Sequence, residues 1–83
     1  MKPVRYSKDA IRTLRRMPRP RAERIRDKVA AYAADPASQA ANVKALQGEP
    51  GVLRLRVGDW RVIFEDGAVI AVIRIGPRGG VYD

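Results

Sequence analysis

The spacing of apolar residues changes along the chain, from a helical period in its first half to a strand period in its second half. The short alternating stretch PVRY, residues 3–6, predicts a first strand. Apolar positions then recur three and four residues apart, which predicts an amphipathic helix over residues 8–17, with Ser7 as its N-cap. A second helix is expected from about Arg21 to Ala34, after two prolines and before a third. Its apolar stripe comprises Ala22, Ile25, Val29, Tyr32 and Ala33.

The second half of the chain carries the signals of a small sheet. Residues 37–51 are expected to connect the two halves, with a short local structure that turns Val43 and Leu46 inward. Three strands are then predicted, joined by tight turns at Gly58-Asp59 and Asp66-Gly67: Val52–Val57, Trp60–Glu65 and Ala68–Ile75. The pattern predicts one α+β domain over residues 1–83, in which a short N-terminal strand and an α-helical hairpin accompany a small, mainly antiparallel β-sheet that the hairpin covers.

Alternation along these strands gathers arginines on the sheet face away from the helices. Because successive side chains point to opposite faces, Leu53, Leu55 and Val57 share the helix side while Arg54 and Arg56 share the open side. Arg61 follows them from the next strand, together with Ile63 and Glu65. In the last strand, strict alternation places Val69, Ala71, Ile73 and Ile75 toward the helices and Ile70, Val72 and Arg74 on the open face. A β-bulge would break this alternation.

The net charge of the chain indicates what this face could bind. Lysine and arginine total 17 against 9 acidic residues, a net charge of +8, and most of the cations are arginine. Arginine forks onto phosphate with two hydrogen bonds, and a basic domain of this kind is typical of polyanion binders. The alternative is an ordinary solvated surface. A cluster of three or four arginines with one acidic neighbour favours phosphate binding, because the cations repel one another without an anion.

Missing residue types narrow the chemistry. The chain has no cysteine and no histidine, so it lacks thiolates, zinc-finger ligands and the commonest acid–base group at neutral pH. No acidic cluster suggests a magnesium site, and we expect neither a metal nor another cofactor. No apolar run of membrane-spanning length and no signal-peptide pattern is present, so a cytoplasmic location without membrane contact is expected.

Two motifs, in this order and after a helical hairpin, carry a resemblance to a known family. They are LRVGDWRVIFE, with an arginine directly after an aromatic residue, and the closing GPRGGVY. Over nearly its whole length the chain resembles the RelE/ParE superfamily of type II toxins, and its closing motif is similar to that of the RelE branch. The resemblance implies a toxin that cleaves mRNA in the ribosomal A site, a metal-independent endoribonuclease. It also implies three partners: the ribosome, mRNA and an acidic antitoxin that forms a hetero-oligomer with the toxin.

Site residues carry over by position in these motifs. In RelE-like toxins the 2′-hydroxyl attacks the adjacent phosphate and the 5′-oxygen leaves, helped by basic residues on the concave sheet face and a C-terminal tyrosine. The resemblance implies that Arg61 and Arg78 hold the scissile phosphate and that Tyr82 acts as general base or stacks on a base. Tyr82 is alternatively an anchor for the end of the chain. Further RNA contacts are expected from Arg54, Arg56 and Arg74.

Two other functions fit parts of the same pattern. The ParE branch shares the fold but inhibits DNA gyrase, and it lacks the catalytic set of the concave face. A nucleic-acid-binding module without activity would need the basic face but not Tyr82. Measurements of mRNA cleavage on ribosomes and of DNA supercoiling by gyrase separate the three functions.

Overall fold

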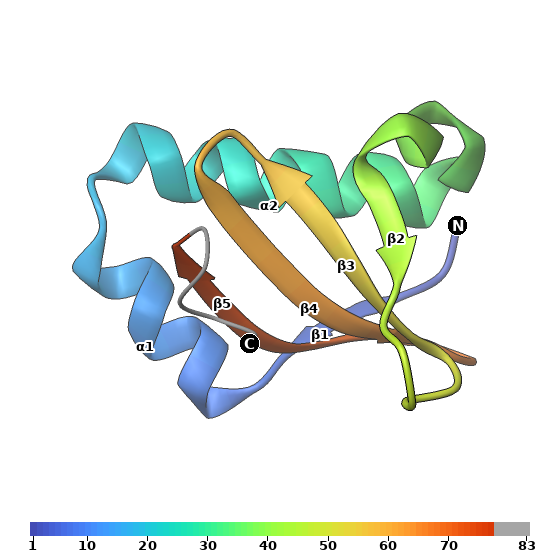
Figure 1. The fold of residues 1–83 in the computed structure, drawn as a ribbon. Coiled ribbons are helices and arrows are strands. Elements are labelled where there is room, and N and C mark those ends of the chain that lie inside the picture. Colours follow the sequence, from blue (N-terminus) through green and yellow to red (C-terminus); the bar gives the residue numbers. More distant parts are fainter. Residues whose placement is uncertain (78–83) are drawn as a thin grey trace.

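Five strands form one sheet in the order β1-β5-β4-β3-β2, and two α-helices cover one of its faces (Figure 1). The computed structural model describes residues 1–77. Within them, the predicted α+β architecture is confirmed. The elements are β1 (Val4–Tyr6), α1 (Lys8–Arg16), α2 (Arg19–Ala34), the 3-10 helix η1 (Pro36–Asn42), β2 (Val43–Ala45), β3 (Val52–Val57), β4 (Trp60–Asp66) and β5 (Ile70–Pro77).

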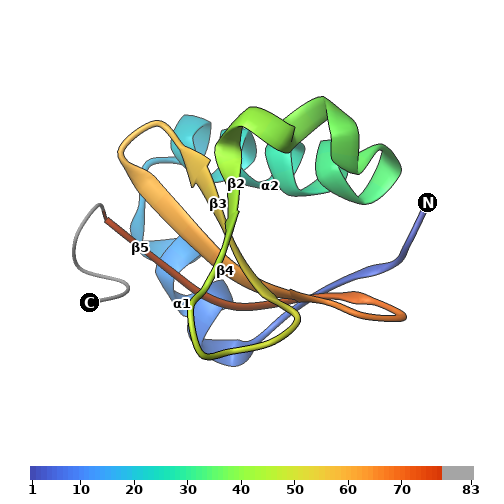
Figure 2. The ribbon, with the colours of Figure 1, turned by 45° about the vertical axis from the view of Figure 1, so that its right-hand side comes forward.

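The predicted meander forms the centre of the sheet. β3 pairs antiparallel with β4, and β4 pairs antiparallel with β5. Gly58 opens the two-residue turn between β3 and β4 with a φ of +60°, a backbone conformation that glycine adopts without steric cost. The two edges come from elsewhere in the chain: β1 pairs parallel with β5, and β2 pairs antiparallel with β3. The expected connector therefore contains a 3-10 helix and a strand, and η1 lies beside α2 (Figure 2).

Local chemistry explains where the helices begin. The Ser7 Oγ accepts a hydrogen bond from the Ala10 backbone N–H at 3.0 Å and so caps α1 as predicted. The same hydroxyl donates to the Ile73 backbone carbonyl at 2.6 Å, which ties the start of the helix to β5. α2 begins at Arg19, earlier than predicted, because Pro20 falls in its first turn, where a missing N–H costs nothing.

The main core lies between the two helices and the sheet. α1 contributes Ala10 and Leu14, and α2 contributes the predicted stripe. The ring of Tyr32 meets that of Phe64 edge to face, with centroids 4.8 Å apart. The strands contribute Leu55, Val57, Val62, Phe64, Ile70, Val72 and Ile75. No helix within residues 1–77 is both long and apolar enough to cross a bilayer.

A β-bulge in β5 corrects the predicted faces of that strand. Ile63 pairs with Arg74 while Phe64 pairs with Val72, so Ile73 is an extra residue opposite β4. Ile70 and Val72 consequently lie in the core, and Ile73 is exposed, the reverse of the strict alternation. Beyond the bulge the phase returns to the predicted one, because Ile75 is buried and Arg74 is exposed.

Leu46 is buried as predicted, but outside the main core. Val43 packs against the main core as predicted, but Leu46 forms a separate small cluster with Ile63 and Val52. Ile63 pairs with Arg54, whose side chain lies on the face away from the helices, so this cluster covers part of that face. Part of the open face is therefore apolar.

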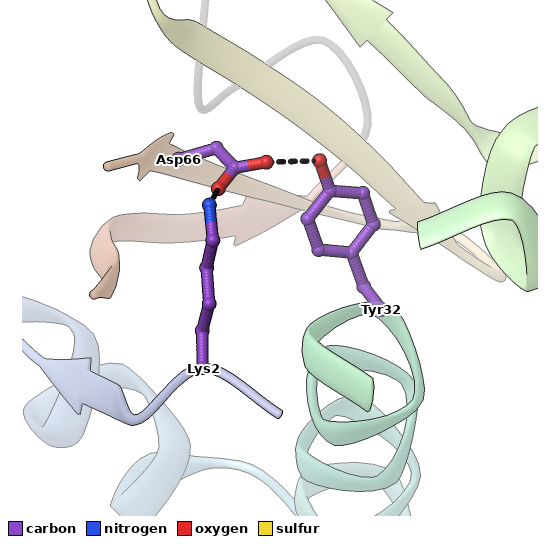
Figure 3. A network of polar contacts seen from close by, with 3 residues as sticks. All are labelled: Lys2, Tyr32 and Asp66. Atoms are coloured by element: carbon purple, nitrogen blue, oxygen red, sulfur yellow. Dashed lines mark hydrogen bonds and ion pairs between the residues drawn. The ribbon is translucent and has the colours of Figure 1, made fainter. Parts of the chain in front are cut away.

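A three-residue polar network joins distant parts of the chain (Figure 3). The Asp66 carboxylate accepts a hydrogen bond from the Tyr32 hydroxyl at 2.6 Å. Its other oxygen lies 2.5 Å from the Lys2 ammonium, with which it forms an ion pair. The start of the chain, α2 and the end of β4 thus meet at a single carboxylate.

Candidate functional site

A hollow of about 230 Å³ opens on the sheet face away from the helices, and cationic side chains dominate its lining. We call it the basic hollow, defined by Ala41, Asn42, Lys44, Arg54, Arg56 and Arg61. Three elements build it. The end of η1 supplies Ala41 and Asn42, and β2, β3 and β4 supply the cations. Among residues 1–77, no acidic residue lines the hollow, so this lining attracts anions.

Strand pairing explains why the cations converge. Lys44 is the direct cross-strand partner of Arg54, and Arg56 is the direct partner of Arg61. Side chains of such pairs share a face and have Cβ atoms about 4.5–5.5 Å apart. Like charges placed directly opposite destabilise a sheet, so the fold holds four cations together against their mutual repulsion. An anion bound among them would relieve that repulsion.

Hydrogen bonds orient two of the arginines. The Arg56 Nη2 donates to the Asn42 side-chain oxygen at 3.3 Å. The Arg61 Nη1 donates to the backbone carbonyls of Gly58 and Trp60, at 3.2 and 3.0 Å, so this half-buried guanidinium is held over the β3–β4 turn. No ion pair within residues 1–77 involves Lys44, Arg54 or Arg56. Their charges therefore remain available to a ligand.

Comparison with known proteins identifies the family. Residues 4–82 match the family model described as the ParE toxin of the type II toxin–antitoxin system parDE. The chain belongs to the ParE toxin family. Solved structures place this ParE-family fold beside the RelE toxins, which confirms the predicted RelE/ParE superfamily.

Three of those structures illustrate the likeness. The archaeal RelE–RelB complex from Pyrococcus horikoshii OT3 holds a chain that is 25% identical, with a TM-score of 0.80, over 95% of this chain and 97% of that one. The isolated E. coli RelE toxin is 17% identical, with a TM-score of 0.78, and the match covers 94% of this chain and 85% of that one. A chain of the intact E. coli RelBE complex is 18% identical, with a TM-score of 0.76, and the match covers 93% of this chain and 96% of that one. No curated protein sequence matches this ParE-family chain.

The structure brings three of the predicted site residues of this ParE-family chain together. Arg54, Arg56 and Arg61 all line the basic hollow. Arg74 lies in the same cross-strand row as Arg54, separated from it by Ile63, and does not line the hollow. Two further predicted residues, Arg78 and Tyr82, lie outside the described residues.

Lys44 and Asn42 were missed at the level of sequence. Both come from the segment that was interpreted as a connector, and the pairing of β2 with β3 brings them to the arginines. The alternation of Val43, Lys44 and Ala45 contained a weak signal, because an inward Val43 places Lys44 on the opposite face. No three side chains of the metal-binding types (His, Cys, Asp, Glu) gather anywhere in residues 1–77.

Proposed function

We propose that this ParE-family chain is a ribosome-dependent, metal-independent endoribonuclease that cleaves mRNA in the A site and so inhibits translation. The observation that supports the proposal is the basic hollow, where four cations from three strands line one space, and no acidic residue of 1–77 is part of that lining. Phosphoryl transfer depends mostly on positioning and on stabilising charge, which fixed cations supply. The positively charged lining of the basic hollow is complementary to a phosphate of the RNA backbone.

In the proposed reaction, the 2′-hydroxyl attacks the adjacent phosphorus and the 5′-oxygen leaves. Negative charge builds up on the non-bridging phosphate oxygens in the transition state. Arg61, held by two backbone carbonyls, is positioned to donate to these oxygens, and Arg54 and Arg56 complete the contacts. Arg78, Tyr82 and Arg74 stay predictions, the first two for catalysis and Arg74 for RNA contact. The ribosome would supply the alignment of the message.

An antitoxin is the second partner in the proposal. Structures of related toxins were solved as RelE–RelB complexes, from Pyrococcus horikoshii OT3 and from E. coli. A net charge of +8 favours an acidic antitoxin that covers the basic surfaces of this toxin and forms a hetero-oligomer with it. Its binding would keep the hollow from RNA in growing cells.

Inhibition of DNA gyrase is the second candidate function. It is favoured by the description of the matching family as ParE toxins. The basic hollow favours RNA cleavage instead, because the gyrase-inhibiting ParE branch lacks the set of basic catalytic residues on the concave face of the sheet. A binding module without activity is the remaining alternative.

The decisive test uses purified toxin with ribosomes programmed with a defined mRNA. We expect toeprinting to reveal a new 5′ end within the A-site codon, and DNA gyrase to supercoil plasmid normally at the same toxin concentration.

Arg61→Ala should lower cleavage by about 10²-fold or more and abolish growth arrest, because a positioned charge in the transition state is lost. Arg12→Ala, at an exposed arginine of α1 on the helix side, serves as the matched control. Inhibited gyrase with intact mRNA would instead establish the second candidate.

A further inference from the structure

We propose that Lys44 is the general acid of the RNA cleavage, the residue that protonates the 5′-oxygen as it leaves. The inference rests on the proposed function and adds a residue and a role to it. Lys44 lies on β2, at the middle position of a three-residue strand. Val43 packs against the main core, so alternation turns the Lys44 side chain to the opposite face, where it lines the basic hollow.

Its register places it beside the phosphate-binding arginines. Lys44 is the cross-strand partner of Arg54, and both side chains line the same hollow as Arg61. A lysine side chain carries its ammonium on a flexible four-carbon stem with three rotatable donors. The ammonium therefore reaches over a phosphate that the arginines hold, without itself being fixed by an ion pair within residues 1–77.

Elimination among the lining residues gives Lys44 its role. Arginine does not deprotonate in proteins, so Arg54, Arg56 and Arg61 stabilise charge but transfer no proton. The alanine and asparagine of the lining have no acidic proton to give at neutral pH. Glu65 lies on the same sheet face but does not line the hollow. Lys44 is thus the proton donor among the side chains that line the hollow in residues 1–77.

The step balances as a transesterification. The bond from the 2′-oxygen to phosphorus forms while the bond from phosphorus to the 5′-oxygen breaks. The 2′-hydroxyl proton passes to solvent water, and the Lys44 ammonium gives a proton to the 5′-oxygen. The products are a 2′,3′-cyclic phosphate and a 5′-hydroxyl, and the neutral amine recovers its proton from solvent. No electron transfer or further reactant is needed.

The test combines Lys44 variants with a changed leaving group, in single-turnover cleavage on programmed ribosomes. One mRNA is ordinary, and the other has sulfur in place of the bridging 5′-oxygen at the cleaved bond. Because a thiolate leaves without protonation, loss of the general acid should slow only the ordinary substrate. We expect Lys44→Met to cleave ordinary mRNA about 10²–10⁴-fold more slowly than the unchanged protein, and the sulfur substrate within a few-fold of it. Lys44→Arg keeps the charge but should be just as slow on ordinary mRNA.

Controls separate this inference from the proposed function. Lys8→Met, at an exposed lysine of α1, should cleave both substrates at the normal rate. Melting temperatures of all variants identify any loss of folding. If the unchanged protein fails to cleave mRNA, the proposed function is wrong. If it cleaves but Lys44→Met is within a few-fold of it, or is equally slow on both substrates, Lys44 is not the general acid and the function stands.

Discussion

Asp66 shows how a single side chain holds three parts of this toxin together, because it accepts from both Lys2 and Tyr32. Hydrogen bonds from these two donors lower the pKa of the Asp66 carboxyl. On the other side of the bond, burial and the hydrogen bond to Asp66 raise the pKa of the Tyr32 hydroxyl to about 12. Both shifts favour a carboxylate and a neutral phenol, so the network has an acid limit and an alkaline limit.

At the acid limit, Asp66→Asn should remove the pH dependence of the network. A lowered carboxyl pKa adds stability that is present above the ordinary value of about 3.9 and is lost as the pH falls through the folded value. We expect the variant to be roughly 1 kcal/mol less stable at pH 7. The difference should shrink below about pH 4, as measured by urea unfolding at pH 7, 4 and 3. A difference that stays constant over this range would contradict the assignment.

At the alkaline limit, Tyr32→Phe is the matching change. A raised phenol pKa adds stability that is present below the ordinary value of about 10 and is lost as the pH rises toward 12. At pH 7 the phenylalanine variant should be less stable by roughly 1–2 kcal/mol, since it lacks a hydrogen bond to a charged acceptor. Between pH 9 and 11.5 its urea midpoint should fall less steeply than that of the unchanged protein. Parallel curves would mean that Tyr32 titrates as it does in the unfolded chain.

At the scale of the element, β5 depends on its bulge. The extra residue Ile73 reverses the phase of the strand, so that Val72 faces the core and Ile73 faces solvent. Its backbone carbonyl at the same time accepts the Ser7 hydroxyl at the start of α1. The bulge therefore sets which side chains are buried and where the first helix is attached.

Two threonine substitutions measure the phase of β5. Val72→Thr puts a hydroxyl into the core in place of a methyl group and should cost about 1–3 kcal/mol of unfolding free energy. Ile73→Thr changes a side chain that is 38% exposed and should alter stability by about 0.5 kcal/mol or less. Urea unfolding of both variants checks the prediction. The opposite order of effects would restore the strict alternation predicted from sequence.

The same element shows what sequence reasoning reached and what it missed. The meander and the two helices were predictable because their signals are local: alternation, helical spacing and the Gly58 turn. The bulge was not, because one extra residue in an apolar run leaves no mark in composition. The positions of β1 and β2 in the sheet were not predicted either, because the place of a three-residue strand depends on which other strand it pairs with. Half of the basic hollow was therefore visible in sequence, through Arg54, Arg56 and Arg61, and its Lys44 and Asn42 were not.

For the whole molecule, the net charge of +8 predicts binding to RNA that depends on salt. Binding is measured with a free single-stranded RNA in the absence of ribosomes, where the proposed ribosome-dependent cleavage does not occur. We expect the logarithm of its binding constant to fall linearly with the logarithm of salt concentration, and Arg54→Ala to reduce the slope by about 0.7. Fluorescence anisotropy between low and high salt measures this slope. An unchanged slope in Arg54→Ala would show that Arg54 does not contact a phosphate of the RNA.

The parallel pairing of β1 with β5 has a consequence for how the toxin is made. Val4 pairs with Ile70, so β1 cannot pair until β5 has been synthesised. Contacts of such long sequence separation carry a high entropy of loop closure and slow the folding of small domains. During synthesis, a nascent chain that has not yet emerged as far as β5 lacks both the partner of β1 and the strand that attaches α1. Pairing of β1 and attachment of α1 therefore follow the synthesis of β5, and until then the toxin lacks one edge of its sheet.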